Sequence, residues 1–213
     1  MSAEFIDFGR SLEALNEPVR EFLQSVTGLQ DGEASQLFVD RARWLRLEQA
    51  AEIVERARIQ LENAGAKPRK ISPKLLVAIL EGASLEDDED QREMWAGMLA
   101  SVAAGTPLGV QYPKLLAEIG SDEIRILKAA CGSPLNTEIA DGERLRSRLR
   151  MPEKRYHVAM DNLFRLRLFI PLVPDRARPA TQYRNPCLTP TGVQLMKVCR
   201  GPSTPPSERA AGF

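Results

Sequence analysis

The stretch SLEDDEDQREMWAGMLASVAA, residues 84–104, decides the fold. Its first part is strongly acidic, and its second part carries apolar side chains at helical spacing. From Trp95 onward the apolar residues recur three and four positions apart, at Met98, Leu99 and Val102, as they do on the buried stripe of a helix. We therefore predict a helix here, with Trp95, Met98 and Leu99 in its core.

Five consecutive acidic residues, 86–90, precede that apolar stripe. Ser84 and Asp87 have the spacing of a capping box, and the helix macrodipole favours negative charge at an N-terminus. A metal site would need carboxylates that converge on one point, whereas consecutive residues spread around a helix start. We predict a solvent-exposed helix start at Ser84, with docking on a basic part of the chain as the second hypothesis.

A longer helix is predicted over residues 35–63. Its apolar positions recur close to a heptad: Leu37, Trp44, Leu47, Ala51, Val54 and Leu61. Arg58 interrupts one core position, and three heptads are marginal for an autonomous coiled coil. Membership of an intramolecular bundle is the favoured interpretation, and a coiled-coil dimer is the alternative. Ser72-Pro73 then starts another helix, because a proline fits the first helical position.

The character of the chain changes after residue 120. The elements predicted there follow the order helix, helix, helix, hairpin, helix, over 122–131, 143–149, 153–167, 169–173 with 183–188, and 189–199. This order is typical of a winged helix, in which a helix-turn-helix pair precedes a β-hairpin. The fold class is therefore predicted as mainly α, with an N-terminal helical bundle and a winged-helix-like C-terminal module that includes a small β-hairpin.

The distribution of charge agrees with this division. Residues 1–120 hold 13 Lys and Arg against 20 Asp and Glu, a net charge of −7, and residues 121–200 hold 15 against 8, a net charge of +7. Four parts are predicted: short helices over 1–36, an acidic helical bundle over 37–120, a basic winged-helix-like module over 121–200, and a disordered Pro/Ser/Gly-rich tail over 201–213.

Residues that carry chemistry are few. His157 is the only histidine, and Cys131, Cys187 and Cys199 form no CxxC pair, so neither a zinc site nor a disulfide framework is indicated. Nucleophile-elbow, P-loop and dinucleotide-binding motifs are missing. We expect no cofactor and no metal, and an enzyme is the less favoured interpretation. The N-terminus lacks a signal-peptide pattern and no apolar run reaches the roughly 18 residues of a membrane span, so a cytoplasmic protein without membrane contact is expected.

The basic module contains the candidate contact residues. Lys154, Arg155 and His157 lie in the N-terminal part of the second helix of the pair, where helix-turn-helix proteins place groove-reading side chains. Three arginines of the hairpin are in reach of a backbone phosphate: Arg176, Arg178 and Arg184. Glu153 and Asp161 share the outward face of the helix, which disfavours DNA. A protein partner or self-association is therefore favoured, and double-stranded DNA is the alternative.

The sequence also carries a family pattern. A Pro-Lys-Leu-Leu helix, Pro73–Leu76, is followed by the signature Ser84–Ser101, in which Trp95-Ala96 is the most specific part. The segments DEIRILKAA, NLFRLRLF and LTPTGVQLMKVC continue the pattern, which covers residues 37–199. This combination resembles the abortive infection alpha family. Gly97-Met98 departs from it, since a polar residue followed by leucine is commoner there.

The resemblance implies a bacterial cytoplasmic protein associated with defence against bacteriophage by abortive infection, and it carries over no catalytic residues. Three hypotheses follow. The favoured one is a non-enzymatic defence component that acts through binding surfaces. The alternatives are a winged-helix DNA-binding regulator and a metal-dependent effector enzyme such as a nuclease.

Overall fold

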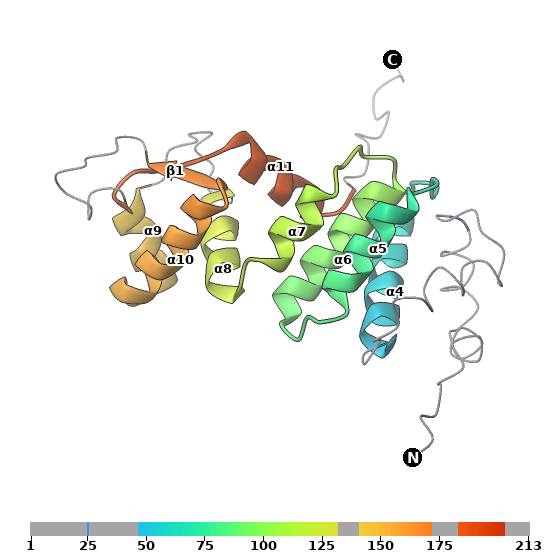
Figure 1. Cartoon of the computed structure of the whole chain (residues 1–213), viewed down its shortest axis with the longest axis horizontal. Coiled ribbons are helices and arrows are strands. Elements are labelled where there is room, and N and C mark those ends of the chain that lie inside the picture. The colour runs from blue at the N-terminus through green and yellow to red at the C-terminus, as the bar shows by residue number, and fades with distance from the viewer. Residues whose placement is uncertain (1–24, 26–46, 132–140, 172–182, 203–213) are drawn as a thin grey trace, which may run out of the picture. The chain divides into compact units, whose positions relative to one another are not determined.

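The computed structural model describes residues 25, 47–131, 141–171 and 183–202. This part of the chain forms eight helices and one antiparallel β-hairpin (Figure 1), which confirms the predicted mainly helical class. The elements are α4 (Leu47–Asn63), α5 (Pro73–Ala83), α6 (Glu89–Ala103), α7 (Gln111–Ala117), α8 (Ser121–Cys131), α9 (Gly142–Leu149), α10 (Glu153–Arg165), β1 (Phe169–Pro171), β2 (Pro186–Leu188) and α11 (Pro190–Cys199). The predicted short helices over 1–36, the first part of the heptad helix and the tail from residue 203 lie outside the described residues.

The chain divides into two compact units. Unit 1 comprises residues 1–114 and 198–213, and unit 2 comprises residues 115–197. One division falls within α7 and the other within α11, so unit 1 includes the last residues of α11 and the segment after it. Among the described helices, none combines the length and the apolar character needed to cross a bilayer.

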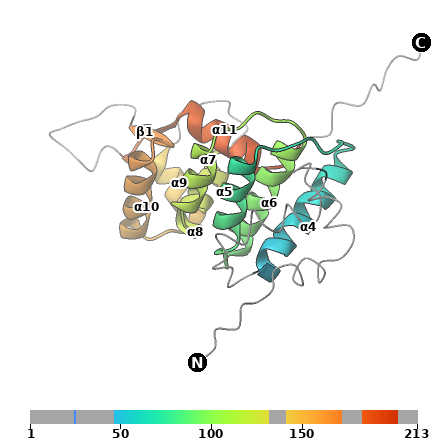
Figure 2. The ribbon, with the colours of Figure 1, turned by 45° about the vertical axis from the view of Figure 1, so that its right-hand side comes forward.

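Helix α6 lies at the centre of unit 1. It contacts α4 and α5, and the three helices lie side by side (Figures 1 and 2). The sequence predicts a single apolar stripe, but eleven of the fifteen residues are buried, so almost every side of the helix is covered. The reason is a further neighbour: the Ser101 hydroxyl donates to the Val198 carbonyl at 2.8 Å, which holds the end of α11 against α6.

The Trp95 indole is packed against Gly82 of α5. Trp95 has an exposed fraction of 0%, as do Met98 and Leu99. A Cβ atom placed on Gly82 would lie 2.3 Å from the indole Cη2 atom, so only a glycine leaves room for the ring. The indole N–H is buried and has no acceptor among the described residues. Shape, rather than hydrogen bonding, therefore holds this side chain.

The predicted helix start at Ser84 is wrong. Helix α6 begins at Glu89, and its N-cap is Asp88, whose carboxylate accepts a hydrogen bond from the Gln91 amide at 3.1 Å. Ser84 instead ends α5, where its hydroxyl donates to the Glu81 carbonyl. Ser84 and Asp88 are both residue types that suit an N-cap. The chain needs the residues between them for the turn from α5 into α6, so Asp88 is the cap of α6.

Helix α4 buries one stripe against the rest of unit 1: Ala50, Ile53, Val54, Ala57 and Leu61. The heptad prediction is correct for Val54 and Leu61 and one residue off at two positions, where it used Ala51 and Arg58 in place of Ala50 and Ala57. A straight helix of 3.6 residues per turn drifts from a seven-residue repeat. Arg58 consequently does not interrupt the core, and its guanidinium pairs with Glu55 and Glu62 on the same helix.

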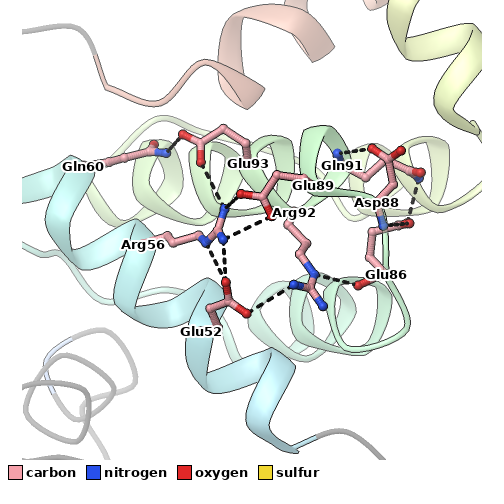
Figure 3. A network of polar contacts seen from close by, with 9 residues as sticks. All are labelled: Glu52, Arg56, Gln60, Glu86, Asp88, Glu89, Gln91, Arg92 and Glu93. Atoms are coloured by element: carbon pink, nitrogen blue, oxygen red, sulfur yellow. Dashed lines mark hydrogen bonds and ion pairs between the residues drawn. The ribbon is translucent and has the colours of Figure 1, made fainter.

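An ion-pair network joins α4 to α6 (Figure 3). The Arg56 guanidinium bonds Glu52 on its own helix and Glu89 of α6, with 2.6 Å between Arg56 Nη1 and Glu89 Oε1. Glu93 lies 3.7 Å from the same guanidinium, and Gln60 donates to the Glu93 carboxylate at 2.6 Å. The hydrogen bond from Arg56 lowers the pKa of Glu89, although the Glu89 side chain is 70% exposed.

Arg92 of α6 supplies a second connection in the same network (Figure 3). Its Nη1 atom lies 3.3 Å from Glu52 Oε2, and its Nε donates to the Glu86 carbonyl. Burial raises the pKa of the Glu86 carboxyl, which accepts hydrogen bonds from the Gln91 side chain and the Asp88 amide. The acidic run therefore bonds within unit 1 as well as facing solvent.

Unit 2 follows the predicted order of elements. Helices α8, α9 and α10 pack together, and β1 lies against α10 (Figure 1). The turn between α9 and α10 contains Arg150 in the left-handed conformation, with φ of 49°. The hairpin pairs Phe169 with Leu188 and Ile170 with Cys187. The second strand is shorter than predicted. The segment 172–182, which includes the last predicted residues of the first strand, lies outside the described residues.

Replacing Gly82 by alanine should destabilise unit 1. A helical Gly→Ala change gains roughly 1 kcal/mol of helix propensity, but overpacking a closed core costs about 1–3 kcal/mol. The indole is completely buried and the added Cβ would lie 2.3 Å from it, so we expect a cost at the upper end of that range, about 2–3 kcal/mol. The net loss in the free energy of unfolding should then be about 1–2 kcal/mol, measured by urea denaturation. Gly120→Ala is the control, because its Cβ would meet only the Glu123 carboxylate, at 3.3 Å. Equal stability of the Gly82→Ala variant and the native chain would contradict this account of the core.

Replacing Arg56 by glutamine should lower the melting temperature by a few degrees at neutral pH, because three carboxylates then lose their shared cation. Glu89 has a lowered pKa in the folded chain, so its pairing stabilises the fold above the unfolded-state pKa of about 4.3. That contribution is lost as pH falls through the lower folded-state value. The difference between variant and native chain should therefore shrink in acid. Arg58→Gln, which removes only contacts within α4, should cost less, and a loss as large as that of Arg56→Gln would refute the bracing role.

Candidate binding surface of unit 2

The outward face of α10 carries the predicted contact residues. Lys154 is exposed and makes no ion pair with any described residue, and His157 is half-buried one turn further on. Val158 beside them is 63% exposed. A shallow hollow passes over Lys154, His157, Val158 and Asp161. The structure thus places two of the three predicted residues of α10 on one open surface.

Arg155 is engaged with α8 rather than free. Its Nε and Nη2 atoms donate to the two carboxylate oxygens of Asp122 at 2.9 Å and 2.8 Å, in a bidentate pair. Asp122 belongs to the first turn of α8, where the helix dipole also favours its charge. The pair ties α10 to α8, and much of the positive charge of Arg155 is balanced inside unit 2.

His157 stacks on a residue that sequence reasoning did not single out as a site residue, Tyr183. The two ring centroids are 4.0 Å apart, with an angle of 16° between the ring planes. The Tyr183 hydroxyl donates to Asp161 Oδ1 at 2.7 Å, so the ring is held at both its face and its tip. Tyr183 precedes β2, 26 positions after His157 in the chain, and no spacing rule connects the two residues.

Arg184 is the one predicted hairpin arginine that the described residues include. Its side chain is 68% exposed and lies 4.0 Å from Glu143 of α9, at the limit of an ion pair. The other two, Arg176 and Arg178, lie outside the described residues. The backbone beside Arg184 is firmly placed, because the Gly142 amide donates to the Arg184 carbonyl at 2.7 Å.

A cleft of about 330 Å³ opens where α9, α10 and the segment 183–184 meet. His157, Tyr183 and Arg184 line it together, so the structure brings a predicted residue of α10 and a predicted residue of the hairpin into one site. Gly142 forms part of the wall and must be a glycine: a Cβ there would lie 1.9 Å from the Tyr183 carbonyl oxygen. The cleft is consequently a built feature rather than a gap between side chains.

Tyr156 lies on the wall of the cleft and is only 2% exposed. Its hydroxyl is buried and makes no hydrogen bond with any described residue. Burial raises the pKa of the phenol, and the Asp141 carboxylate adds to this effect while Arg146 opposes it. The sequence pattern assigned Tyr156 to the apolar face of the helix, and nothing in that pattern shows that its hydroxyl lacks a partner.

The charges on this surface are mixed. Glu153 and Asp161 accompany Lys154 on the face of α10, so the exposed helix carries two acids and one lysine. Within the described ranges, no group of three or more His, Cys, Asp or Glu side chains is placed to hold a metal ion. Cys131, Cys187 and Cys199 form no disulfide.

Comparison with known proteins identifies the family. Neither the curated proteins nor the solved structures include a significant match to the chain. The family described as abortive infection alpha matches residues 43–199, a range that contains every described element from α4 to α11. This range is well over half of the 213 residues. The chain therefore belongs to the abortive infection alpha family.

Proposed function

We propose that this protein is a non-enzymatic component of bacterial defence against bacteriophage, active in the cytoplasm, and that it acts by binding a protein partner or a second copy of itself. Membership of the abortive infection alpha family supports the biological role. The observation that supports a binding role is the open surface of unit 2, where the exposed Val158 adjoins Lys154 and the cleft beside His157. A partner that covers this surface would bury Val158 among polar contacts, as protein interfaces bury apolar side chains inside a polar rim.

The mixed charge of α10 supports a protein partner over DNA. Phosphate contacts supply most of the affinity of DNA-binding proteins, and they come from unpaired lysines and arginines. On this helix Arg155 is paired with Asp122, and Glu153 and Asp161 would face the phosphates. A protein surface can match such alternating charges, and this arrangement favours specific partners over wrong ones.

The charge of Lys154 should be needed for defence. We expect a sensitive bacterium that expresses the native protein to give fewer plaques with at least one member of a phage panel. Lys154→Glu should restore most of the plaques, because it places three acids on the face of α10. Lys197→Glu makes the same chemical change at an exposed position of α11 and should keep protection. Full protection by Lys154→Glu, with both variants present at native levels, would show that this face has no part in defence.

A winged-helix DNA-binding regulator is the second candidate, and the net charge of +7 over residues 121–200 supports it. Fluorescence anisotropy with duplex DNA at two salt concentrations separates the two candidates. A DNA-binding protein loses affinity steeply with salt, with a slope of about −0.9 per phosphate contacted, and Lys154→Glu should reduce that slope by about one. We expect no such binding at physiological salt. Arg155 is unsuitable for this test, because its loss would also leave Asp122 without a partner.

A further inference from the structure

The cleft of unit 2 contains two polar groups that the fold does not use. The Tyr156 hydroxyl is buried and has no hydrogen-bond partner among the described residues, and an unpaired buried hydroxyl costs a folded protein stability. Arg146 of α9 is half-buried on the wall of the same cleft, and its guanidinium makes no ion pair with the described residues. Both groups are hydrogen-bond donors, and neither finds an acceptor in the described part of the chain.

We infer that this cleft is a binding site for a carboxylate that carries a planar apolar group. The carboxylate would accept hydrogen bonds from the Arg146 guanidinium and the Tyr156 hydroxyl. The planar group would lie against the aromatic wall formed by His157 and Tyr183. This inference goes beyond the proposed function, since it concerns the cleft itself and does not depend on what covers the face of α10.

The aromatic wall of the cleft is the reason for proposing a ligand with a planar group. His157 and Tyr183 are stacked with nearly parallel planes, and the hydrogen bond from the Tyr183 hydroxyl to Asp161 fixes the position of the end of the ring. Flat side chains held in this way favour ligands that have a flat face of their own. Little side-chain freedom is lost when a ligand binds, because the rings are already in place.

The charges of the residues that line the cleft favour a ligand with a single carboxylate over a multiply charged anion. Glu143 and Glu153 line the same cleft as Arg146 and Arg184, so the charges of the lining sum to zero, although Arg146 pairs with neither glutamate. A phosphate dianion would meet both glutamates, whereas one carboxylate can be directed to the donors at Tyr156 and Arg146. Arginine and carboxylate also match geometrically, since the guanidinium donates two parallel hydrogen bonds to the two oxygens.

The size of the cleft is suited to such a ligand. Its volume of about 330 Å³ is at the lower end of the range for small-molecule sites. The frame is fixed by the Gly142–Arg184 hydrogen bond and by the close contact of Gly142 with the Tyr183 carbonyl. The carboxylate could belong to a free small acid or to the end of a peptide, and both present the same chemistry.

The test uses matched probes with the full-length protein. N-acetylphenylalanine and N-acetylphenylalaninamide differ only in the carboxylate, and benzoate represents a free small acid. Binding is measured by saturation-transfer NMR titration. We expect at least one of the two acids to bind and the amide to bind at least about tenfold more weakly. Tighter binding of N-acetylphenylalanine would identify a peptide carboxylate as the source, and tighter binding of benzoate a free acid.

Variants assign the donors. Arg146→Gln and Tyr156→Phe should each weaken binding of the acid by about tenfold. Arg148→Gln is the control, because Arg148 is an exposed arginine of the same helix that does not line the cleft. Tyr156→Phe should also raise the melting temperature of the free protein, since it removes a buried hydroxyl that has no partner. If the hydroxyl instead had a hydrogen-bond partner in the fold, Tyr156→Phe would lower the melting temperature.

Any of three binding results would overturn the inference: no binding of either acid, equal binding of acid and amide, or equal effects of Arg146→Gln and Arg148→Gln. A fall in melting temperature for Tyr156→Phe would do so as well, because it would show that the hydroxyl already has a partner. None of these results bears on Lys154, so the outcome is separate from that of the plaque assay.

Discussion

The contact between the Trp95 indole and the Cα of Gly82 is the constraint on which unit 1 depends. An indole is the largest side chain that a helix can bury, and α6 buries it completely because α5 presents no side chain at the point of contact. Burial of this ring sets the distance between α5 and α6. The Arg56 and Arg92 network then aligns α4 on the remaining side. Apolar contact thus sets how close the helices come, and the ion pairs set which residues face each other.

Much of this fold could be predicted from the sequence because the signals are local. Caps, prolines and helical periodicity locate α5, α8, α10 and α11 to within a few residues. The errors arise where two local signals compete. Ser84 and Asp88 are both good caps, and only the length of the turn between α5 and α6 decides between them. For α4, the heptad pattern predicts Ala51 and Arg58 in the core, whereas the structure buries Ala50 and Ala57, one position earlier. Which of the two sets is buried depends on the packing against the neighbouring helices.

The candidate site was less predictable, because it depends on contacts between distant residues. Lys154 and His157 could be placed on one helix face by spacing alone. The pairing of Arg155 with Asp122 and the stacking of His157 on Tyr183 join segments 33 and 26 positions apart. Composition also overstates the charge available to a partner. Arginines and acids are counted in the net charge of each half, yet several of them are already bonded to each other within their own unit.

The position of Gly97 has a consequence for the order of folding. Its missing side chain lets the backbone of Cys199 and Gly201 lie directly on α6, and the Ser101 hydroxyl binds the Val198 carbonyl beside it. The core of unit 1 is therefore closed by residues that the ribosome adds only after the whole of unit 2. During translation, one side of α6 stays uncovered after α4, α5 and α6 have been synthesised. Residues 115–197 then emerge and can fold as an inserted unit before that side is covered. Helix α6 is therefore completely buried only after the residues that follow unit 2 in the sequence have been added.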